Sequence, residues 1–179
     1  MALKATIFKA DLQIADMDRH YYQEHSLTLA RHPSETDERM MMRLLAFALY
    51  ADERLAFGKG LSDEEEPDLW QKDLTGAIER WIEVGLPDEK RIRKASNRAQ
   101  QVVLLTYGSR AAEVWRQQNA SALARHKNLT VLHLPEAASL ALAALSQRTM
   151  RLQCQIQDGQ IWLGDEQTRL EVTPERWQG

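Results

Sequence analysis

The sequence predicts an α/β fold in which helices flank a mixed central sheet, followed by a C-terminal antiparallel meander. Between Ile78 and Leu134 the pattern strand, helix, strand, helix, strand requires crossover connections and therefore some parallel pairing. From Met150 to Gln157 apolar and polar residues alternate, which is typical of a strand buried on one face. The chain has 179 residues, so we expect one domain over residues 1–179.

The N-terminal third predicts a hairpin followed by a long helix. The segments Lys4–Ile14 and Tyr21–Leu29 have strand-like composition and flank a polar break. Ser34 and Asp37 resemble a capping box, and apolar residues at helical spacing follow. We expect this helix to run from about Glu35 to Phe57 and to bury its run of three methionines as core.

The middle of the chain predicts a second hairpin and then the alternating pattern. Pro67–Asp73 and Ala77–Gly85 form the hairpin. Pro87 sits where it can begin a helix. The elements expected after that helix are a strand over Gln101–Tyr107, a helix over Arg110–His126, a strand over Leu129–Leu134 and a short helix over Glu136–Ser146.

The C-terminal part predicts three consecutive antiparallel strands. Met150–Gln157 is followed by the two-residue turn signal Asp158-Gly159, and Ile161–Leu163 and Thr168–Val172 complete the meander. Cys154 shares the apolar face of its strand, so we expect a buried, inert thiol.

Composition limits the partners and the location. The formal net charge is −3, so nucleic acid could be bound only through a local basic patch. With one cysteine there is no intrachain disulfide. The N-terminus has no apolar signal segment and the longest apolar run is too short for a bilayer, so we expect a cytoplasmic protein without a membrane partner. A monomer is expected, since no exposed apolar stripe is evident.

The absence of three motifs removes several enzyme classes from consideration. The sequence contains no GxxxxGK[ST] phosphate loop, no GxGxxG fingerprint and no GxSxG elbow. P-loop nucleotide hydrolysis, dinucleotide redox chemistry and serine hydrolysis therefore have no support.

Asp68 and Glu83 are the strongest candidates for chemistry. They lie 15 residues apart, which is one strand, a turn and most of a second strand. Because adjacent strands are about 4.8 Å apart, carboxylates at matching heights can reach one divalent ion. Such hard oxygen ligands suit Mg²⁺ or Mn²⁺, which would assist in-line attack on a phosphodiester. The alternative is structural, with Asp68 starting a strand and Glu83 at a solvated strand end.

Five segments give the chain its resemblance to bacterial proteins of the YaeQ family. They are Ala2–Ile7, the Glu35–Leu49 helix, Glu66–Trp70, Trp81–Pro87 and Arg91–Ala95. Pro67-Asp68 followed by Ile82–Gly85 resembles the PD-(D/E)XK motif. The resemblance implies a restriction-endonuclease-like α/β roll and a metal-dependent nuclease, with Asp68 and Glu83 as metal ligands.

One position departs from that motif. Two residues after Glu83 the motif has lysine, but here Gly85 occupies the position. Some superfamily members place this lysine on the following helix, which makes Lys94 the catalytic candidate and Lys90 the second. The resemblance also implies an acidic residue on the first core helix, either Glu38 or Glu35.

The helix after Pro87 also carries a basic face. Positions three and four apart share one side of a helix, so four cations cluster as a candidate nucleic-acid-binding surface: Lys90, Arg91, Lys94 and Arg98. The structural alternative is a solvated face that balances the helix dipole. The acidic run Asp63–Glu66 is expected to be a mobile loop, which would repel DNA if it stayed near the site.

Two functions follow from these patterns. The first is a nuclease or other phosphodiester hydrolase that uses Mg²⁺ or Mn²⁺, favoured by the two carboxylates beside a basic helix. The second is a non-catalytic module that binds nucleic acid or a protein through the same fold, favoured by Gly85.

Overall fold

The structure is a computed structural model that describes residues 4–179. Ala2 and Leu3, which contribute to the family resemblance, lie outside the described residues. The chain divides into two compact units. One comprises the chain up to Ala48 together with Ala137–Thr173, and the other comprises Leu49–Glu136 and Pro174–Gly179. Each unit has its own mixed sheet, whereas the sequence predicted one central sheet. That the chain forms one domain remains a prediction.

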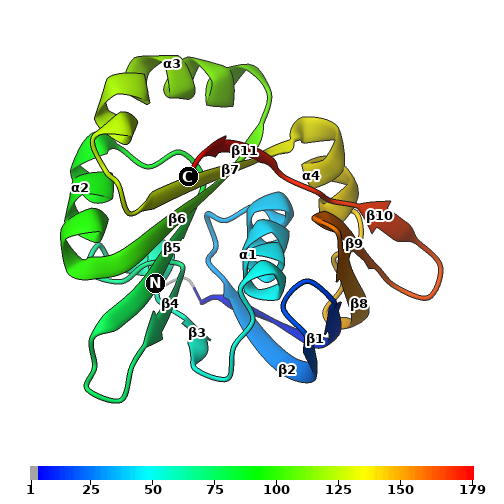
Figure 1. Ribbon diagram of the computed structural model, residues 1–179. Coiled ribbons are helices and arrows are strands. Elements are labelled where there is room, and N and C mark those ends of the chain that lie inside the picture. Colours follow the sequence, from blue (N-terminus) through cyan, green and yellow to red (C-terminus); the bar gives the residue numbers. More distant parts are fainter. Residues whose placement is uncertain (1–3) are drawn as a thin grey trace. The chain divides into compact units, whose positions relative to one another are not determined.

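The first unit is built on a five-stranded sheet with the order β10-β9-β8-β1-β2. Its strands are β1 (Thr6–Asp16), β2 (Tyr21–Arg31), β8 (Thr149–Gln157), β9 (Gln160–Gly164) and β10 (Arg169–Glu171). The predicted N-terminal hairpin is confirmed, because β1 and β2 pair antiparallel along their whole length. The predicted meander also exists, but β8 pairs in parallel with β1. It therefore completes the sheet of the N-terminal hairpin and does not extend the sheet of the middle segment (Figure 1).

Helix α1 (Asp37–Leu49) is shorter than the predicted helix over Glu35–Phe57. Thr36 caps its start in place of Ser34, since the Thr36 Oγ1 accepts a hydrogen bond from the Arg39 N–H at 3.1 Å. After Leu49 the chain turns at Asp52, whose Oδ1 accepts from the Arg54 N–H, and continues as a short strand. The helix therefore ends at Leu49, before the expected end at Phe57.

The expected core residues of the first unit are buried. Met40, Met41 and Met42 are fully buried, as predicted. Cys154 is also buried, and burial raises the pKa of its thiol to about 12, so the thiolate is scarce at neutral pH. The short helix α4 (Glu136–Ala143) ends earlier than predicted, before Ser146.

The second unit contains a six-stranded sheet with the order β11-β7-β6-β5-β4-β3. Its strands are β3 (Leu55–Phe57), β4 (Leu69–Lys72), β5 (Ile78–Val84), β6 (Ala99–Gly108), β7 (Leu129–Pro135) and β11 (Glu175–Gln178). Strands β5, β6 and β7 are parallel and are connected through α2 (Glu89–Arg98) and α3 (Arg110–Ala124). The predicted crossovers are thus confirmed, and so is the hairpin of β4 and β5. A short 3₁₀ turn, η1 (Gly60–Ser62), precedes β4.

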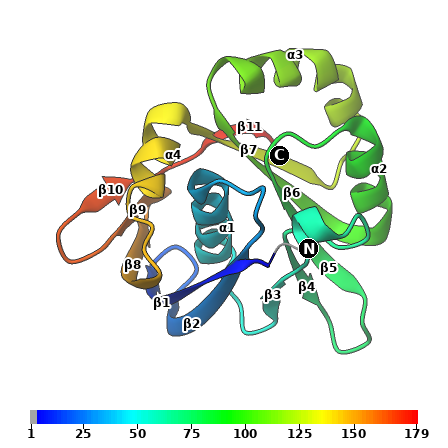
Figure 2. The same cartoon turned by 180° about the vertical axis from the view of Figure 1, so that it is seen from behind.

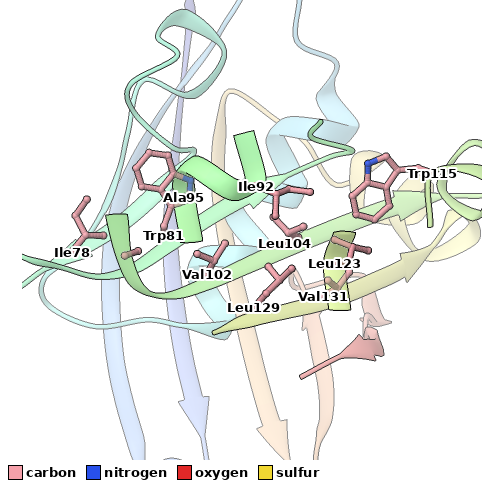
Figure 3. Packing of buried hydrophobic residues seen from close by; sticks show 11 residues of the cluster. Ile78, Trp81, Ile92, Ala95, Val102, Leu104, Trp115, Leu123, Leu129 and Val131 are labelled. Atoms are coloured by element: carbon pink, nitrogen blue, oxygen red, sulfur yellow. The ribbon is translucent and has the colours of Figure 1, made fainter. Parts of the chain in front are cut away.

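Helices α2 and α3 pack on one face of this sheet (Figure 2). Their buried residues Ile92, Ala95, Trp115 and Leu123 join a cluster of strand residues to form the core of the unit. Figure 3 shows the strand residues of this cluster, which are Ile78, Trp81, Val102, Leu104, Leu129 and Val131. Trp81 is fully buried in this core.

Strand β11 has no counterpart among the predicted elements. It pairs antiparallel with β7, and the Trp177 ring stacks on the His133 ring with a centroid separation of 4.1 Å. The Gln178 side chain also donates to the Leu123 carbonyl at 2.8 Å. Within the described part of the chain, no helix combines the length and apolar character needed to cross a membrane.

Candidate active site

The hairpin of β4 and β5 brings Asp68 and Glu83 together. Leu69 lies opposite Ile82 in the antiparallel register, so the preceding Asp68 lies opposite Glu83. The Val84 N–H donates to the Asp68 Oδ2 at 2.8 Å, which fixes this carboxylate at the end of β5. The two acidic residues selected by spacing are therefore neighbours.

Both carboxylates are removed from solvent. The exposed fraction is 1% for Asp68 and 4% for Glu83. Burial raises the pKa of Glu83 to about 7, and the negative charge of Asp68 acts in the same direction, while Arg91 and the Trp81 hydrogen bond partly oppose it. Glu83 is thus poised to change its charge near neutral pH, which is a property common at functional sites.

Arg91 is the cation that reaches the carboxylate pair. The Glu83 Oε1 accepts hydrogen bonds from Arg91 Nε and from Trp81 Nε1, both at 2.8 Å. Trp81 and Glu83 share a face of β5 because side chains alternate along a strand, and α2 packs on that face. The Asp88 side chain caps α2 by accepting from the Arg91 N–H, so the start of the helix holds Arg91 in position.

A tight loop supports Asp68 from the other side. The Gly58 N–H donates to the Asp68 carbonyl at 2.9 Å, and the Gly60 N–H donates to the Pro67 carbonyl at 3.1 Å. A Cβ atom on Gly60 would lie 2.4 Å from Asp68 Oδ1, and Gly60 has a φ of +51°. Glycine at this position therefore allows the buried carboxylate to pack closely against the loop.

Lys94 and Arg98 lie farther along α2 than Arg91, and Lys90 precedes it. Lys94 contacts the Glu65 carboxylate, and Arg98 donates to the Glu65 carbonyl at 3.2 Å. Lys90 is exposed. The predicted basic face therefore exists, with Arg91 at Glu83 and Lys94 at Glu65.

The predicted helix carboxylates belong to the first unit. The Glu38 Oε2 accepts a hydrogen bond from the Ser139 hydroxyl at 2.8 Å. Glu35 is buried and forms an ion pair with Arg43, with both of its oxygens accepting from that guanidinium at 2.7–2.9 Å. Glu35 therefore has a structural partner, and a role for Glu38 beside Asp68 and Glu83 stays a prediction.

The backbone explains why glycine occupies the position of the motif lysine. Gly85 has a φ of +108°, and a Cβ there would meet nothing within 4 Å. The limit on this position is therefore conformational and not steric, because residues with a side chain rarely adopt that φ. Gly85 also donates to the Leu105 carbonyl, which holds the chain as it leaves β5.

The donor set fits a hard divalent ion that keeps much of its water. Among residues 4–179 no cluster of three or more His, Cys, Asp and Glu side chains could hold a metal. The two buried carboxylates alone suit Mg²⁺ or Mn²⁺, because such ions bind through one or two carboxylates together with water and substrate phosphate. A dication would also relieve the repulsion between Asp68 and Glu83.

Three features of the candidate site were not identified from the sequence. They are the Trp81 hydrogen bond to Glu83, the ion pair of Arg91 with Glu83, and the close packing of Gly60 on Asp68. The Trp81 bond had a signal, because Trp81 and Glu83 are two residues apart in a predicted strand. The other two depend on how α2 and the loop pack, which no local pattern contains.

Comparison with known proteins decides the family. The chain matches the family model described as YaeQ protein over residues 1–174. The chain belongs to the YaeQ family. It is 53% identical over 178 residues to the uncharacterized protein YaeQ of Escherichia coli K12, covering 99% of this chain and 98% of that protein. Its identity to the corresponding Salmonella typhi protein is 52%, with the same coverage.

Crystal structures of YaeQ proteins share the fold. The structure from Xanthomonas axonopodis pv. citri matches with a TM-score of 0.94 at 52% identity, covering 98% of this chain and 99% of that chain. The structure from Pseudomonas syringae matches with a TM-score of 0.93 at 39% identity, covering 98% and 97%. The chain therefore shares its fold with these two YaeQ proteins.

Proposed function

We propose that this YaeQ protein is a divalent-metal-dependent phosphodiester hydrolase that acts on nucleic acid as a cytoplasmic monomer. The observation that carries the proposal is the buried pair of Asp68 and Glu83 on neighbouring strands, with the pKa of Glu83 raised to about 7. Isolated buried charges are costly unless they are compensated, so a partly compensated carboxylate pair is a candidate functional site.

The residues have distinct proposed roles. Asp68 and Glu83 would hold Mg²⁺ or Mn²⁺, which supplies Lewis-acid polarisation of the phosphodiester and an acidified water. Val84 and Trp81 orient the two carboxylates by hydrogen bonds. Arg91 balances the charge of Glu83.

The finer assignments are part of the same proposal. Lys94 is proposed to stabilise charge in the transition state, in place of the lysine missing at Gly85, and Glu38 to assist the carboxylates. Lys90, Arg91, Lys94 and Arg98 are proposed to bind the phosphate backbone. The fold is proposed to be that of the PD-(D/E)XK superfamily, since Asp68 precedes β4, Glu83 lies one residue before the end of β5 and a helix with basic residues follows.

Cleavage of labelled nucleic acids tests the proposal. The purified protein is incubated with single-stranded, duplex and branched DNA and RNA in Mg²⁺ or Mn²⁺, beside Glu83→Gln and Glu79→Gln. Glu79 is the matched control, because it lies on the same strand and pairs with Arg54. We expect metal-dependent cleavage that Glu83→Gln reduces at least about 100-fold and Glu79→Gln retains. Absence of cleavage by the wild-type protein on every substrate and with both metals would contradict the proposal.

The second candidate is a non-catalytic module that binds nucleic acid or a protein. Two ion pairs favour this function. Arg91 contacts Glu83 and Lys94 contacts Glu65, so both cations proposed for the site already have carboxylate partners. A protein that binds nucleic acid without cleaving it, and whose binding is unchanged in Glu83→Gln, would fit this second function.

A further inference from the structure

The acidic segment Asp63–Glu66 contacts the basic face of α2. The Arg91 guanidinium donates to two of its main-chain carbonyls, with Nη1 bonding Glu64 and Nη2 bonding Glu66, both at 2.9 Å. Since the Arg91 Nε bonds Glu83, one side chain connects the acidic segment to the carboxylate pair. The segment expected to be a mobile loop therefore has defined partners.

Glu65 adds a bridge between two cations one helical turn apart. Its Oε1 contacts Lys94 Nζ, and its Oε2 lies 3.5 Å from Arg98 Nη1. The hydrogen bond and charge of Lys94 hold the pKa of Glu65 below its ordinary value, so Glu65 is ionised at neutral pH. A carboxylate that bridges a lysine and an arginine has the charge and acceptor geometry that a backbone phosphate would offer.

Backbone hydrogen bonds to Gly60 hold both ends of the acidic segment, whereas the Glu65 side chain in its middle is held by exposed ion pairs. On one side the Asp63 N–H donates to the Gly60 carbonyl at 3.1 Å, and on the other Pro67 accepts from Gly60. In between, the Glu65 side chain remains 69% exposed. Exposed ion pairs contribute little and weaken with salt, so a ligand with several negative charges can replace them.

We propose that the acidic segment is an internal mimic of a nucleic-acid backbone, which covers the anion-binding face of Arg91, Lys94 and Arg98 until a nucleic acid displaces it. The class of ligand rests on the proposed function. Displacement of the segment would also regulate the site, because the segment ends two residues before Asp68 and holds the guanidinium of Arg91, whose Nε contacts Glu83. A chain of net charge −3 would thus present a basic face only when a nucleic acid displaces the acidic segment.

Binding without cleavage tests the inference. Fluorescence anisotropy of a labelled single-stranded DNA and of its duplex is measured in EDTA at low salt for the wild-type protein, Glu65→Gln and Glu53→Gln. Glu53 is an exposed glutamate of the same unit and provides a control with the same change in charge. We expect Glu65→Gln to bind about three- to tenfold more tightly than both other proteins, since it weakens the competing ion pairs.

A second substitution shows whether the gain passes through the proposed face. Lys94→Gln is expected to weaken binding, and the double variant Glu65→Gln with Lys94→Gln is expected to bind no more tightly than Lys94→Gln alone. Equal affinity of Glu65→Gln and Glu53→Gln, or no binding by any variant, would overturn the inference. Tighter binding by Glu65→Gln without any cleavage in Mg²⁺ or Mn²⁺ would contradict the hydrolase and leave the internal mimic supported. Metal-dependent cleavage without tighter binding by Glu65→Gln would support the hydrolase and contradict the internal mimic.

Discussion

At the scale of single residues, the surroundings of Glu83 set its protonation. Burial and the neighbouring Asp68 raise the pKa of Glu83 to about 7, although Arg91 and Trp81 both donate hydrogen bonds to it. The folded protein therefore binds a proton more tightly than the unfolded chain does, where the pKa is ordinary. Stability gained from this proton is complete below the unfolded pKa of 4.5 and is lost as the pH rises through about 7.

Substituting Glu83 by glutamine should remove this pH dependence. Between pH 5 and pH 8 we expect the wild-type free energy of unfolding to fall by about 2–3 kcal/mol more than that of Glu83→Gln. Urea denaturation at the two pH values measures this difference, and Glu79→Gln serves as the control. Identical pH dependence in the wild-type protein and Glu83→Gln would show that Glu83 titrates normally.

Gly85 illustrates how backbone conformation limits a catalytic motif. Restoring the motif lysine by Gly85→Lys should lower the free energy of unfolding by about 1–3 kcal/mol, because the φ of +108° is unfavourable for a side chain. Thermal or urea unfolding measures the loss, with Gly85→Ala as a comparison that carries the same strain without the charge. A stable Gly85→Lys variant would mean that the chain can relax at the end of β5.

At the scale of elements, β11 adds an antiparallel strand to β7 in the sheet of the second unit. The Trp177 ring stacks on His133 of β7, and the Cζ of Arg116 in α3 lies 4.4 Å from the Trp177 ring centroid. Burial lowers the pKa of His133, and its Nδ1 shares a hydrogen bond of 2.8 Å with the Thr106 hydroxyl. Burial in the sheet thus favours the uncharged form of this imidazole.

Trp177→Ala should loosen β11 and expose His133. We expect a loss of about 1–3 kcal/mol in the free energy of unfolding and a rise in the pKa of His133 toward the ordinary value of 6.5. Urea denaturation gives the first quantity, and an NMR titration of the imidazole gives the second. Trp177→Phe retains a ring for stacking and should change both less. If Trp177→Ala leaves the His133 titration unchanged, the shift has another cause.

The elements that were predicted correctly are those whose signals are local. The hairpin of β1 and β2, the hairpin of β4 and β5, and the alternation of β8 are visible in the residue pattern. Helix α1 was predicted too long, because the chain leaves the helix after Leu49 and turns at Asp52, while Leu55–Phe57 form a separate strand. Strand β11 was not predicted, since its pairing depends on β7 and has little apolar alternation of its own.

At the scale of the whole molecule, each of the two compact units is made of two segments that are separate in the sequence. The parallel pairing of β1 with β8 joins Lys9 to Thr149, and no local pattern specifies such a distant contact. The same limit applies to the site. The spacing of Asp68 and Glu83 predicted their proximity, and the periodicity of α2 predicted its basic face. Which cation contacts Glu83 depends on how α2 packs on the sheet, so Arg91 could not be distinguished from Lys94 in advance.

The distribution of charge over the molecule agrees with the proposed function. The formal net charge is −3, yet α2 carries five cations in ten residues. The acidic segment lies on this helix and lowers the local excess of positive charge. Association with a polyanion should weaken as salt is added, with a modest slope, because it depends on a few phosphate contacts.

Binding of Mn²⁺ measured by electron paramagnetic resonance is the most direct test of the carboxylate pair. The signal of free Mn²⁺ is titrated at pH 8 with the wild-type protein, Asp68→Asn, Glu83→Gln and the control Glu79→Gln. We predict one site that is lost in Asp68→Asn and Glu83→Gln, is retained in Glu79→Gln and weakens as the pH falls below about 7, where Glu83 gains its proton. Equal Mn²⁺ binding by all four proteins, or none by the wild-type protein, would contradict a metal site at Asp68 and Glu83.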